Sequence, residues 1–235
     1  MKKEIVYIIT RYNQDEHLNY LVSYLNKNYP DFKIIVASNT PNSKNKYMHL
    51  ESICTFIKNK QNRGHILGYL DLINLGIKEA LKDSGVNYII SSSSDVSLHP
   101  SSTYLNLVNR LTSKKNKKVL SNSWMKTKNL ATEFFIIKAS KAKQVFPLNI
   151  GKFVMCILPI HNLLHKNFGL GFAFVEKVFY KSFSKNEILY FKERKFVSQK
   201  IRYESLKDNL YYNSQENFKV KIKNIENFEN SKKTS

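Results

Sequence analysis

The stretch that decides the fold is Glu-Ile-Val-Tyr-Ile-Ile-Thr at residues 4–10, followed by the polar sequence Arg-Tyr-Asn-Gln at residues 11–14. The first run is rich in β-branched and aromatic residues, which is typical of a short buried strand. Asp15 can then cap a helix whose apolar residues recur with a period of 3.6 and which ends at Pro30. The chain therefore opens with a strand that leads directly into a helix.

The same alternation continues through the first 100 residues. Further strands are predicted at 32–37, 53–57 and 86–92, with a helix at 66–82. Beyond residue 100 the pattern loosens into a helix at 101–111, strands at 118–121 and 131–138, and helices at 139–146 and 152–167. Alternating strands and helices indicate βαβ units. We therefore predict an α/β protein with a Rossmann-like, mainly parallel sheet flanked by helices and a basic helical C-terminal region.

Charge is unevenly distributed along the chain, whose formal net charge is +20. Residues 1–100 are close to neutral, whereas residues 101–235 carry most of the positive charge. We predict one continuous unit with halves at 1–100 and 101–212, followed by a basic, loosely held tail at 213–235. Such a field attracts polyanions, namely nucleic acid, acidic lipid headgroups or a phosphorylated substrate. The alternative is a solvated face, because lysine far outnumbers arginine.

Cysteine use and hydropathy point to a compartment. Cys54 and Cys156 cannot build a disulfide framework, and the N-terminal apolar run is too short for a signal peptide. The apolar run at 153–160 falls far short of the roughly 20 residues that span a bilayer. We expect a soluble, cytoplasmic protein, with peripheral contact at an anionic inner membrane surface as a further expectation.

Polar residues follow each predicted strand of the first half. In an open parallel sheet, ligands bind beyond the carboxyl ends of the strands, so these residues should meet at one edge. Their hydroxyl and amide groups suit a base and a ribose. The predicted donor-binding residues are Thr10, Tyr12, Asn13, Ser38, Asn39, Asn62, Arg63, Gly64, Gly68, Asp71, Ser94 and Asp95.

Two of these positions have a specific chemistry. Gly64 leaves the following helix uncapped, and free backbone N–H groups there favour a diphosphate, although a tight turn is the alternative. Asp95 becomes favourable beside a diphosphate when Mn²⁺ or Mg²⁺ bridges both, and the alternative is a turn-forming or helix-capping aspartate, which is the commoner role of such a residue. His99, four residues later, is a second candidate metal ligand.

The order of these motifs resembles the nucleotide-sugar glycosyltransferases of the GT-A fold, broadly of glycosyltransferase family 2 type. The resemblance rests on residues 5–13 as first strand and donor-binding turn, on 34–39 as second strand, and on Asn-Arg-Gly at 62–64 with Asn-Leu-Gly at 74–76. Residues 88–97 stand where that family carries its Asp-x-Asp metal motif, with Asp95 present and Ser97 in the second position. The resemblance implies a nucleotide-sugar-binding first half and an acceptor-binding second half.

In that family a carboxylate of the second half takes the acceptor's proton as the acceptor attacks the anomeric carbon. Glu176 is surrounded by apolar residues, and Glu133 begins an apolar strand. We predict Glu176 as base and Glu133 as an acceptor-site residue, with a solvent-facing or ion-paired glutamate as the alternative for each.

The sequence thus predicts a glycosyltransferase of cell-surface glycan biosynthesis. It would move a sugar by inverting displacement from a nucleotide-sugar donor to a glycan or lipid-linked acceptor, with no nucleic acid as partner. Two alternatives stay open: a non-catalytic polyanion- or nucleic-acid-binding protein, and a degenerate transferase that binds donor without turnover.

Overall fold

The computed structural model describes residues 4–11, 15–39, 50–61, 63–100, 102–124, 126–150, 174–190, 203–206, 209–213 and 217–233. Tyr12, Asn13 and Asn62, and the helix predicted at 152–167, lie outside these residues.

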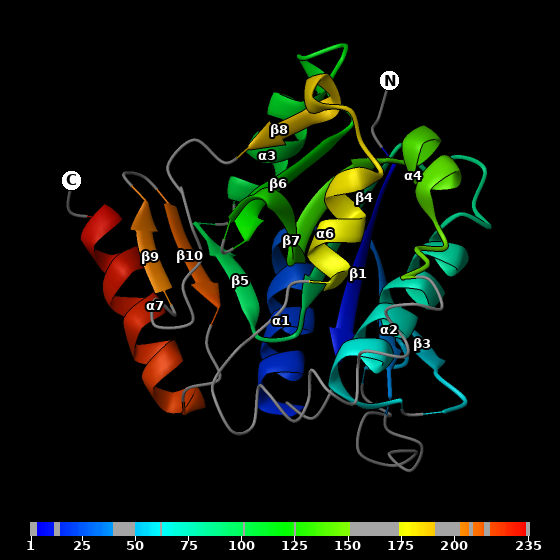
Figure 1. The fold of residues 1–235 in the computed structure, drawn as a ribbon. Coiled ribbons are helices and arrows are strands. Elements are labelled where there is room, and N and C mark those ends of the chain that lie inside the picture. The colour runs from blue at the N-terminus through cyan, green and yellow to red at the C-terminus, as the bar shows by residue number, and fades with distance from the viewer. Residues whose placement is uncertain are drawn as a thin grey trace, which may run out of the picture.

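A seven-stranded sheet forms the centre of the molecule (Figure 1). Its strands are β1 (Ile5–Arg11), β2 (Lys33–Ser38), β3 (Thr55–Lys58), β4 (Tyr88–Ser93), β6 (Val119–Trp124), β7 (Lys126–Lys138) and β8 (Ile188–Tyr190). They are ordered β3-β2-β1-β4-β7-β6-β8. β7 runs antiparallel to both of its neighbours, and the other neighbouring pairs are parallel. The predicted mainly parallel α/β sheet is confirmed.

β1 is buried on both faces of the sheet. Ile5, Tyr7 and Ile9 face one hydrophobic cluster, and Val6 and Ile8 face the other. Because side chains alternate along a strand, only a strand that is apolar throughout can lie between two helical layers. This is the physical reason why an uninterrupted apolar run begins the chain.

Helices cover both faces of this sheet. α1 (Asp15–Asn28) and α3 (Thr103–Thr112) pack on one face, and α2 (Gly64–Ala80), α4 (Ala139–Val145) and α6 (Phe174–Lys181) pack on the other. A Cβ atom on Gly76 would lie 2.5 Å from Cγ2 of Ile8. Gly76 therefore permits close packing of α2 against β1.

A second, smaller sheet was not predicted from the sequence. It joins β5 (Val96–His99) to β10 (Asn209–Asn213) and β9 (Tyr203–Leu206), all antiparallel. The chain then forms α7 (Phe218–Lys233), which lies beside these strands in Figure 1. Lys221 and Ile225 of α7 are buried. This differs from the loosely held tail that the sequence suggested.

Among the residues that the structure describes, no helix combines the length and the apolar character needed to cross a membrane. A single turn of 3₁₀ helix at Lys185–Glu187 leads into β8.

Candidate active site

The carboxyl ends of β1, β2 and β4 meet through backbone hydrogen bonds. The N–H of Ser94 donates to the carbonyl of Thr10 at 3.0 Å, and the N–H of Asn39 donates to the carbonyl of Arg11 at 3.4 Å. The polar residues that follow these strands are thus held together at one edge of the sheet, as the parallel arrangement requires. At this lower edge in Figure 1 the β1 arrow ends.

Arg11 ends β1 and Asn39 directly follows β2, so both lie at this edge of the sheet. The buried Arg11 side chain donates from Nη1 to Oγ of Ser38 at 3.0 Å and from Nε to Oδ1 of Asp15 at 3.1 Å. Oδ1 of Asn39 accepts a hydrogen bond from Nδ2 of Asn59 at 2.9 Å. Nδ2 of Asn39 is buried and has no partner within the described part of the chain. This amide can donate to a ligand oxygen.

Asp95 lies in the turn between β4 and β5, with 7% of its surface exposed. Its backbone carbonyl accepts a hydrogen bond of 2.8 Å from Nζ of Lys221 on α7. The same Nζ lies 3.4 Å from Nδ1 of His17, near the start of α1. Burial lowers the pKa of Lys221 to about 8, and the Asp95 carboxylate acts in the opposite direction. A buried ammonium group therefore stands directly beside the Asp95 turn.

Tyr69, on the second turn of α2, connects this helix to β7. Its hydroxyl donates to the carbonyl of Thr132 at 2.7 Å. Burial raises the pKa of Tyr69 well above its ordinary value, the negative charge of Glu133 raises it further, and a hydrogen bond with Thr10 lowers it. The charges of Glu176 and Asp95 also raise it. The Tyr69 hydroxyl is thus hydrogen-bonded to the residue that precedes Glu133.

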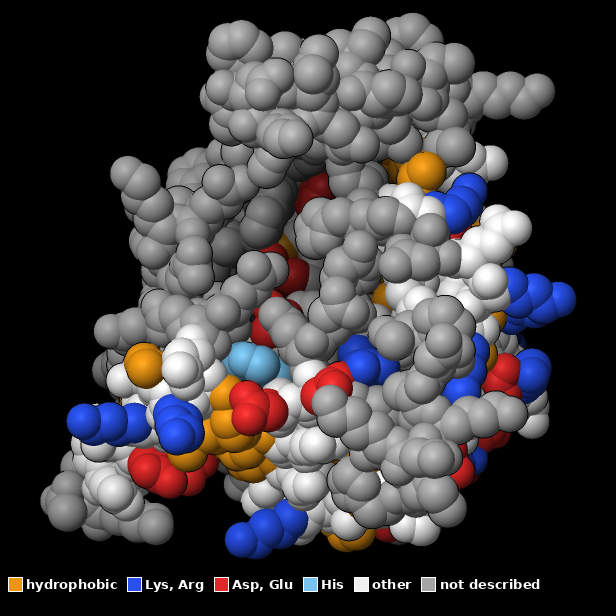
Figure 2. Space-filling model, turned by 90° about the horizontal axis from the view of Figure 1, so that it is seen from below, with side chains coloured by type: hydrophobic (Ala, Val, Ile, Leu, Met, Phe, Trp, Pro, Cys, Tyr) orange, Lys and Arg blue, Asp and Glu red, His pale blue; other side chains and the backbone are white. Residues whose placement is uncertain are grey.

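The direction of β7 explains how Glu133 reaches the carboxyl edge of the sheet. Phe134 of β7 pairs with Ser92, next to the last residue of β4, so Glu133 lies at the carboxyl end of β4. The chain between Glu133 and Glu176 returns to the sheet with α6, where Oε1 of Glu176 accepts a hydrogen bond from Oγ1 of Thr132 at 3.3 Å. Viewed from this edge, Figure 2 shows acidic side chains at the bottom of a hollow.

Burial raises the pKa of Glu176, although its hydrogen bonds with its own backbone and with Thr132 lower it. A carboxylate whose pKa lies above its ordinary value is a better proton acceptor once it is ionised. Glu176 therefore has the environment that was predicted for a general base.

Several predicted donor-binding residues interact with one another. Nε of Arg63 donates to Oδ2 of Asp71 at 2.7 Å, and Nη2 donates to Oδ1, which makes a two-pronged ion pair. This pair raises the pKa of Arg63. α2 begins at Gly64, directly after Arg63, and no side chain caps its first turn. Gly68 is buried one residue before Tyr69.

His99 is turned toward α1 and α7. Its Nδ1 lies 3.1 Å from Oε1 of Glu229, and its ring centre lies 4.8 Å from that of Tyr24. The side chain has no exposed surface, and burial lowers its pKa. His99 is thus engaged with α7 at the far end of β5 from Asp95.

The residues described around Asp95 do not fit a divalent metal ion. No group of three or more His, Cys, Asp or Glu side chains among the described residues is placed to hold one. Ser97 supplies a buried hydroxyl without a described partner where a second carboxylate would stand. Lys221 adds a positive charge at the same turn, and that charge opposes a cation.

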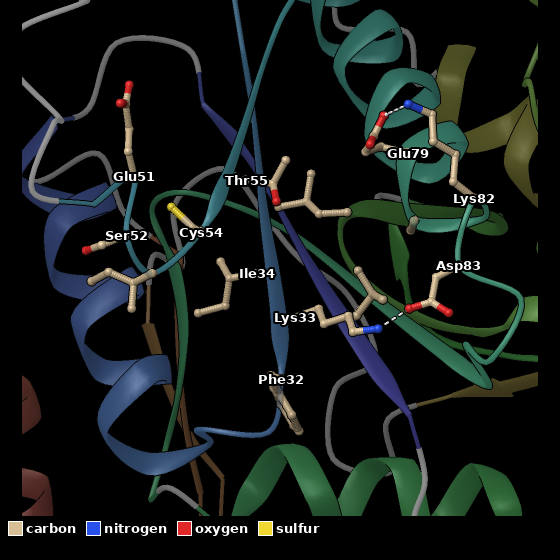
Figure 3. A pocket seen from close by; sticks show the side chains of 14 residues that line it. Phe32, Lys33, Ile34, Glu51, Ser52, Cys54, Thr55, Glu79, Lys82 and Asp83 are labelled. Atoms are coloured by element: carbon tan, nitrogen blue, oxygen red, sulfur yellow. Dashed lines mark hydrogen bonds and ion pairs between the residues drawn. The ribbon is translucent and has the colours of Figure 1, made fainter.

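A pocket of ≈ 590 Å³ lies at the opposite, amino edge of the sheet (Figure 3). Phe32 and Lys33 at the start of β2 line it, together with Cys54 and Asp83. Lys33 forms an ion pair with Asp83, and Lys82 forms one with Glu79. These charges neutralise one another, and the pocket lies away from the strand ends that bind ligands in open sheets. We therefore place the candidate site at the carboxyl edge.

Two described lysines of the second half, Lys118 and Lys138, lie at the amino edge. Lys118 precedes β6, and Lys138 ends β7 opposite Tyr88, the first residue of β4. Lys118 contributes to lowering the pKa of Lys138, after the effect of burial, so the two ammonium groups are near each other. These lysines face away from the candidate site and do not supply positive charge to it.

Comparisons with known proteins bear on the fold. No protein-family model and no curated protein matches the sequence. Residues 1–349 of S. aureus TarS match with a TM-score of 0.54 and 11% identity, over 90% of this chain and 60% of that chain. Another structure of S. aureus TarS matches with a TM-score of 0.53 and 11% identity, over 85% of this chain and 37% of that chain. The present chain thus spans less than two thirds of either.

At this level of identity the likeness concerns the fold alone. The chain has a GT-A-like, Rossmann-like fold, with a mixed, mostly parallel sheet flanked by helices, which it shares with the TarS structures. The predicted fold class is therefore confirmed.

Proposed function

We propose that this chain, with its GT-A-like fold, is a glycosyltransferase that moves a sugar from a nucleotide-sugar donor to an acceptor hydroxyl. The observation that carries the proposal is the hydrogen-bonded carboxyl edge of the sheet. There Ser94, next to Asp95, bonds to Thr10 of β1. Thr132, next to Glu133, bonds to Tyr69 and to Glu176. Asp95 comes from the first half of the chain and both glutamates come from the second, and we propose that these halves hold the donor and the acceptor.

The donor would lie over the ends of β1, β2 and β4. Asn39 offers a buried amide N–H, suited to an oxygen of the base or the ribose. The uncapped start of α2 offers backbone N–H groups to the diphosphate.

Glu176 would act as base in an inverting displacement. Its ionised carboxylate takes the proton of the acceptor hydroxyl, whose oxygen forms a bond to the anomeric carbon. The bond from that carbon to the diphosphate oxygen breaks, and the nucleoside diphosphate leaves with the electron pair. Glu133 would hold the acceptor beside Glu176. The acceptor we propose is a glycan or a lipid-linked sugar.

The test is a donor-hydrolysis assay with a panel of nucleotide-sugars, compared with nucleotide-induced shifts in melting temperature. We expect one donor to release its nucleoside diphosphate. Asp95→Asn should lower this rate by about 10²-fold or more, because the Asp95 carboxylate would face the positive charge that develops at the anomeric carbon as the diphosphate leaves. Asp83→Asn, in the amino-edge pocket, is the matched control and should leave the rate unchanged.

Other products identify other functions. Release of pyrophosphate from a nucleoside triphosphate mixed with a sugar phosphate, with no nucleoside diphosphate released from any nucleotide-sugar, would indicate nucleotidyl transfer and contradict the proposal. Donor binding without turnover would identify a degenerate transferase. Binding of nucleic acid that decreases with salt and is insensitive to Asp95→Asn, with no binding of any nucleotide-sugar, would favour the polyanion-binding alternative.

A further inference from the structure

We propose that the positive charge beside the donor diphosphate comes from Lys221 of the chain itself, and that the site works without a divalent metal ion. This inference rests on the proposed function, because it concerns the same diphosphate. Lys221 would act as a positioning residue: it holds the Asp95 turn and provides a fixed charge next to it, without being required to touch the substrate.

The first support is the location of the ammonium group. Nζ of Lys221 donates to the carbonyl of Asp95 at 2.8 Å and lies 3.4 Å from Nδ1 of His17. It therefore connects the turn between β4 and β5 to the first turn of α1, the helix that follows the end of β1. The Asp95 turn is the part of this contact that belongs to the carboxyl edge, where the donor is proposed to bind.

The second support is the burial of this charge. The Lys221 side chain has no exposed surface. Burying an ammonium group is costly unless it is hydrogen-bonded or compensated by negative charge. Charge interactions are also stronger in such an environment than in water, because the effective dielectric constant is lower. A diphosphate bound at the Asp95 turn would supply further compensating charge.

The third support is the way in which α7 fixes the group. Lys221, Ile225 and Glu229 follow one another at intervals of four residues and therefore share one face of α7. Lys221 contacts one end of the Asp95–His99 segment and Glu229 contacts the other, with Nδ1 of His99 3.1 Å from its carboxylate. Ile225 packs between them in a small apolar cluster with Tyr20. α7 thus contacts both ends of the Asp95–His99 segment.

The fourth support is the loss of the ligands that a metal would need. Ser97 provides a neutral hydroxyl where the resembled family has a second carboxylate. Asp95 alone provides one carboxylate, whereas divalent ions in proteins are usually held by several hard oxygen ligands. Lys221 adds a positive charge at the Asp95 turn, and Ser97 supplies no negative charge there. Both residues therefore disfavour a divalent cation.

The experiment measures binding of five nucleoside diphosphates, those of adenosine, guanosine, cytidine, uridine and thymidine, by calorimetry in EDTA and again in Mn²⁺. We expect one of them to bind equally well in both. Binding only in Mn²⁺ would overturn this inference and leave the proposed function intact. No binding in either condition would overturn both.

Variants then test Lys221 itself. Lys221→Met keeps the aliphatic stem and should weaken diphosphate binding in EDTA by about tenfold or more, since it removes a charged group. Binding of the corresponding uncharged nucleoside should not change. Lys221→Arg, which keeps the charge, should restore much of the affinity. Lys223→Met, at an exposed position on the same helix, is the matched control.

The nucleoside distinguishes a role of the charge from a merely structural role. If Lys221→Met only loosened the site, it would weaken the binding of the nucleoside and of the nucleoside diphosphate to the same extent. That result would overturn the inference. An effect no larger than that of Lys223→Met would also overturn it. If Lys221→Met fails to fold, the comparison between EDTA and Mn²⁺ on the unmodified protein, together with Lys221→Arg, still decides the question.

Discussion

Replacing Glu176 by glutamine should reduce catalysis and increase stability at neutral pH. Glutamine has the shape of glutamate, and its side-chain oxygen can still accept the 3.3 Å hydrogen bond from Oγ1 of Thr132. The variant therefore leaves no cavity and no unpaired hydroxyl. What it removes is a buried negative charge and a proton acceptor.

The effect on activity follows from the loss of the base. A positioned general base contributes about 10²–10⁴-fold to the rate, so kcat should fall by that factor, with a smaller change in the KM for the donor. In free energy the loss corresponds to about 2.7–5.5 kcal/mol of transition-state stabilisation.

The effect on stability has a defined sign. The pKa of Glu176 is raised in the folded protein, so between its unfolded and folded pKa values the folded state binds more protons. The free energy of unfolding therefore falls as pH rises through that interval. Glu176→Gln abolishes this pH-dependent loss of stability, because glutamine does not ionise. The variant and the wild type should differ least below the ordinary pKa of a glutamate and should diverge in favour of the variant as pH rises above it.

Calorimetric melting temperatures across this pH range, with kcat measured at each value, test both expectations. A stability difference of the same size at every pH would show that Glu176 does not carry a penalised buried charge. An unchanged kcat in a folded variant would show that Glu176 is not the base. Either result would contradict the proposal that the carboxylate of Glu176 is destabilised by burial and serves as the general base.

Two further predictions concern the scaffold of the site. Gly76→Ala should lower the free energy of unfolding by about 1–3 kcal/mol, because the new Cβ would meet Cγ2 of Ile8, and urea denaturation measures this change; an equally or more stable variant would contradict the close packing of α2 on β1. Tyr104→Phe should cost about 1–3 kcal/mol, because the N–H of Leu98, which donates to the Tyr104 hydroxyl at 3.1 Å, loses its partner. Accelerated hydrogen exchange at Leu98 is the specific readout for β5, and unchanged exchange would show that the hydroxyl does not hold that strand.

The sequence was sufficient to predict the first half of the fold because local pattern and tertiary burial agree there. All seven residues of β1 are buried, and an apolar run has no other stable place in a globular chain. Once parallel strands are predicted, their polar ends must share one edge. Thr10, Ser38 and Ser94 were therefore found by topology alone.

The small second sheet could not be predicted in this way. β5 is only four residues long, too short for the alternation of Val96 and Leu98 with Ser97 and His99 to stand out as a strand. Its partner strand, β10, begins at Asn209, more than 100 residues later in the chain. A pairing so distant leaves no periodic signal in either segment. The strand is held by long-range contacts.

Tyr69, Thr132 and Lys221 were missed for related reasons. Tyr69 lies beside the apolar stripe of its helix, and its hydroxyl becomes relevant only because β7 brings the carbonyl of Thr132 to 2.7 Å. Lys221 stands in a lysine-rich segment where nothing distinguishes the one buried lysine from its exposed neighbours, Lys219 and Lys223. Burial of a charge depends on the partners that surround it, and these come from distant parts of the chain.

The Asp95 turn shows why such distant contacts matter for chemistry. The carbonyl of Thr10 in β1 accepts a hydrogen bond from the N–H of Ser94, and Nζ of Lys221 in α7 donates to the carbonyl of Asp95. The hydroxyl of Tyr104 in α3 accepts a hydrogen bond from the N–H of Leu98, in the strand that follows the turn. A carboxylate on a turn fixed from three sides keeps its orientation without reorganising when charge develops on a substrate. A turn held by its own residues would have to be ordered at the moment of binding, at a cost in conformational entropy. The contribution of α7 therefore belongs to the preorganisation of the site, and the C-terminal helix should be retained in any shortened form of this protein that is meant to bind a donor.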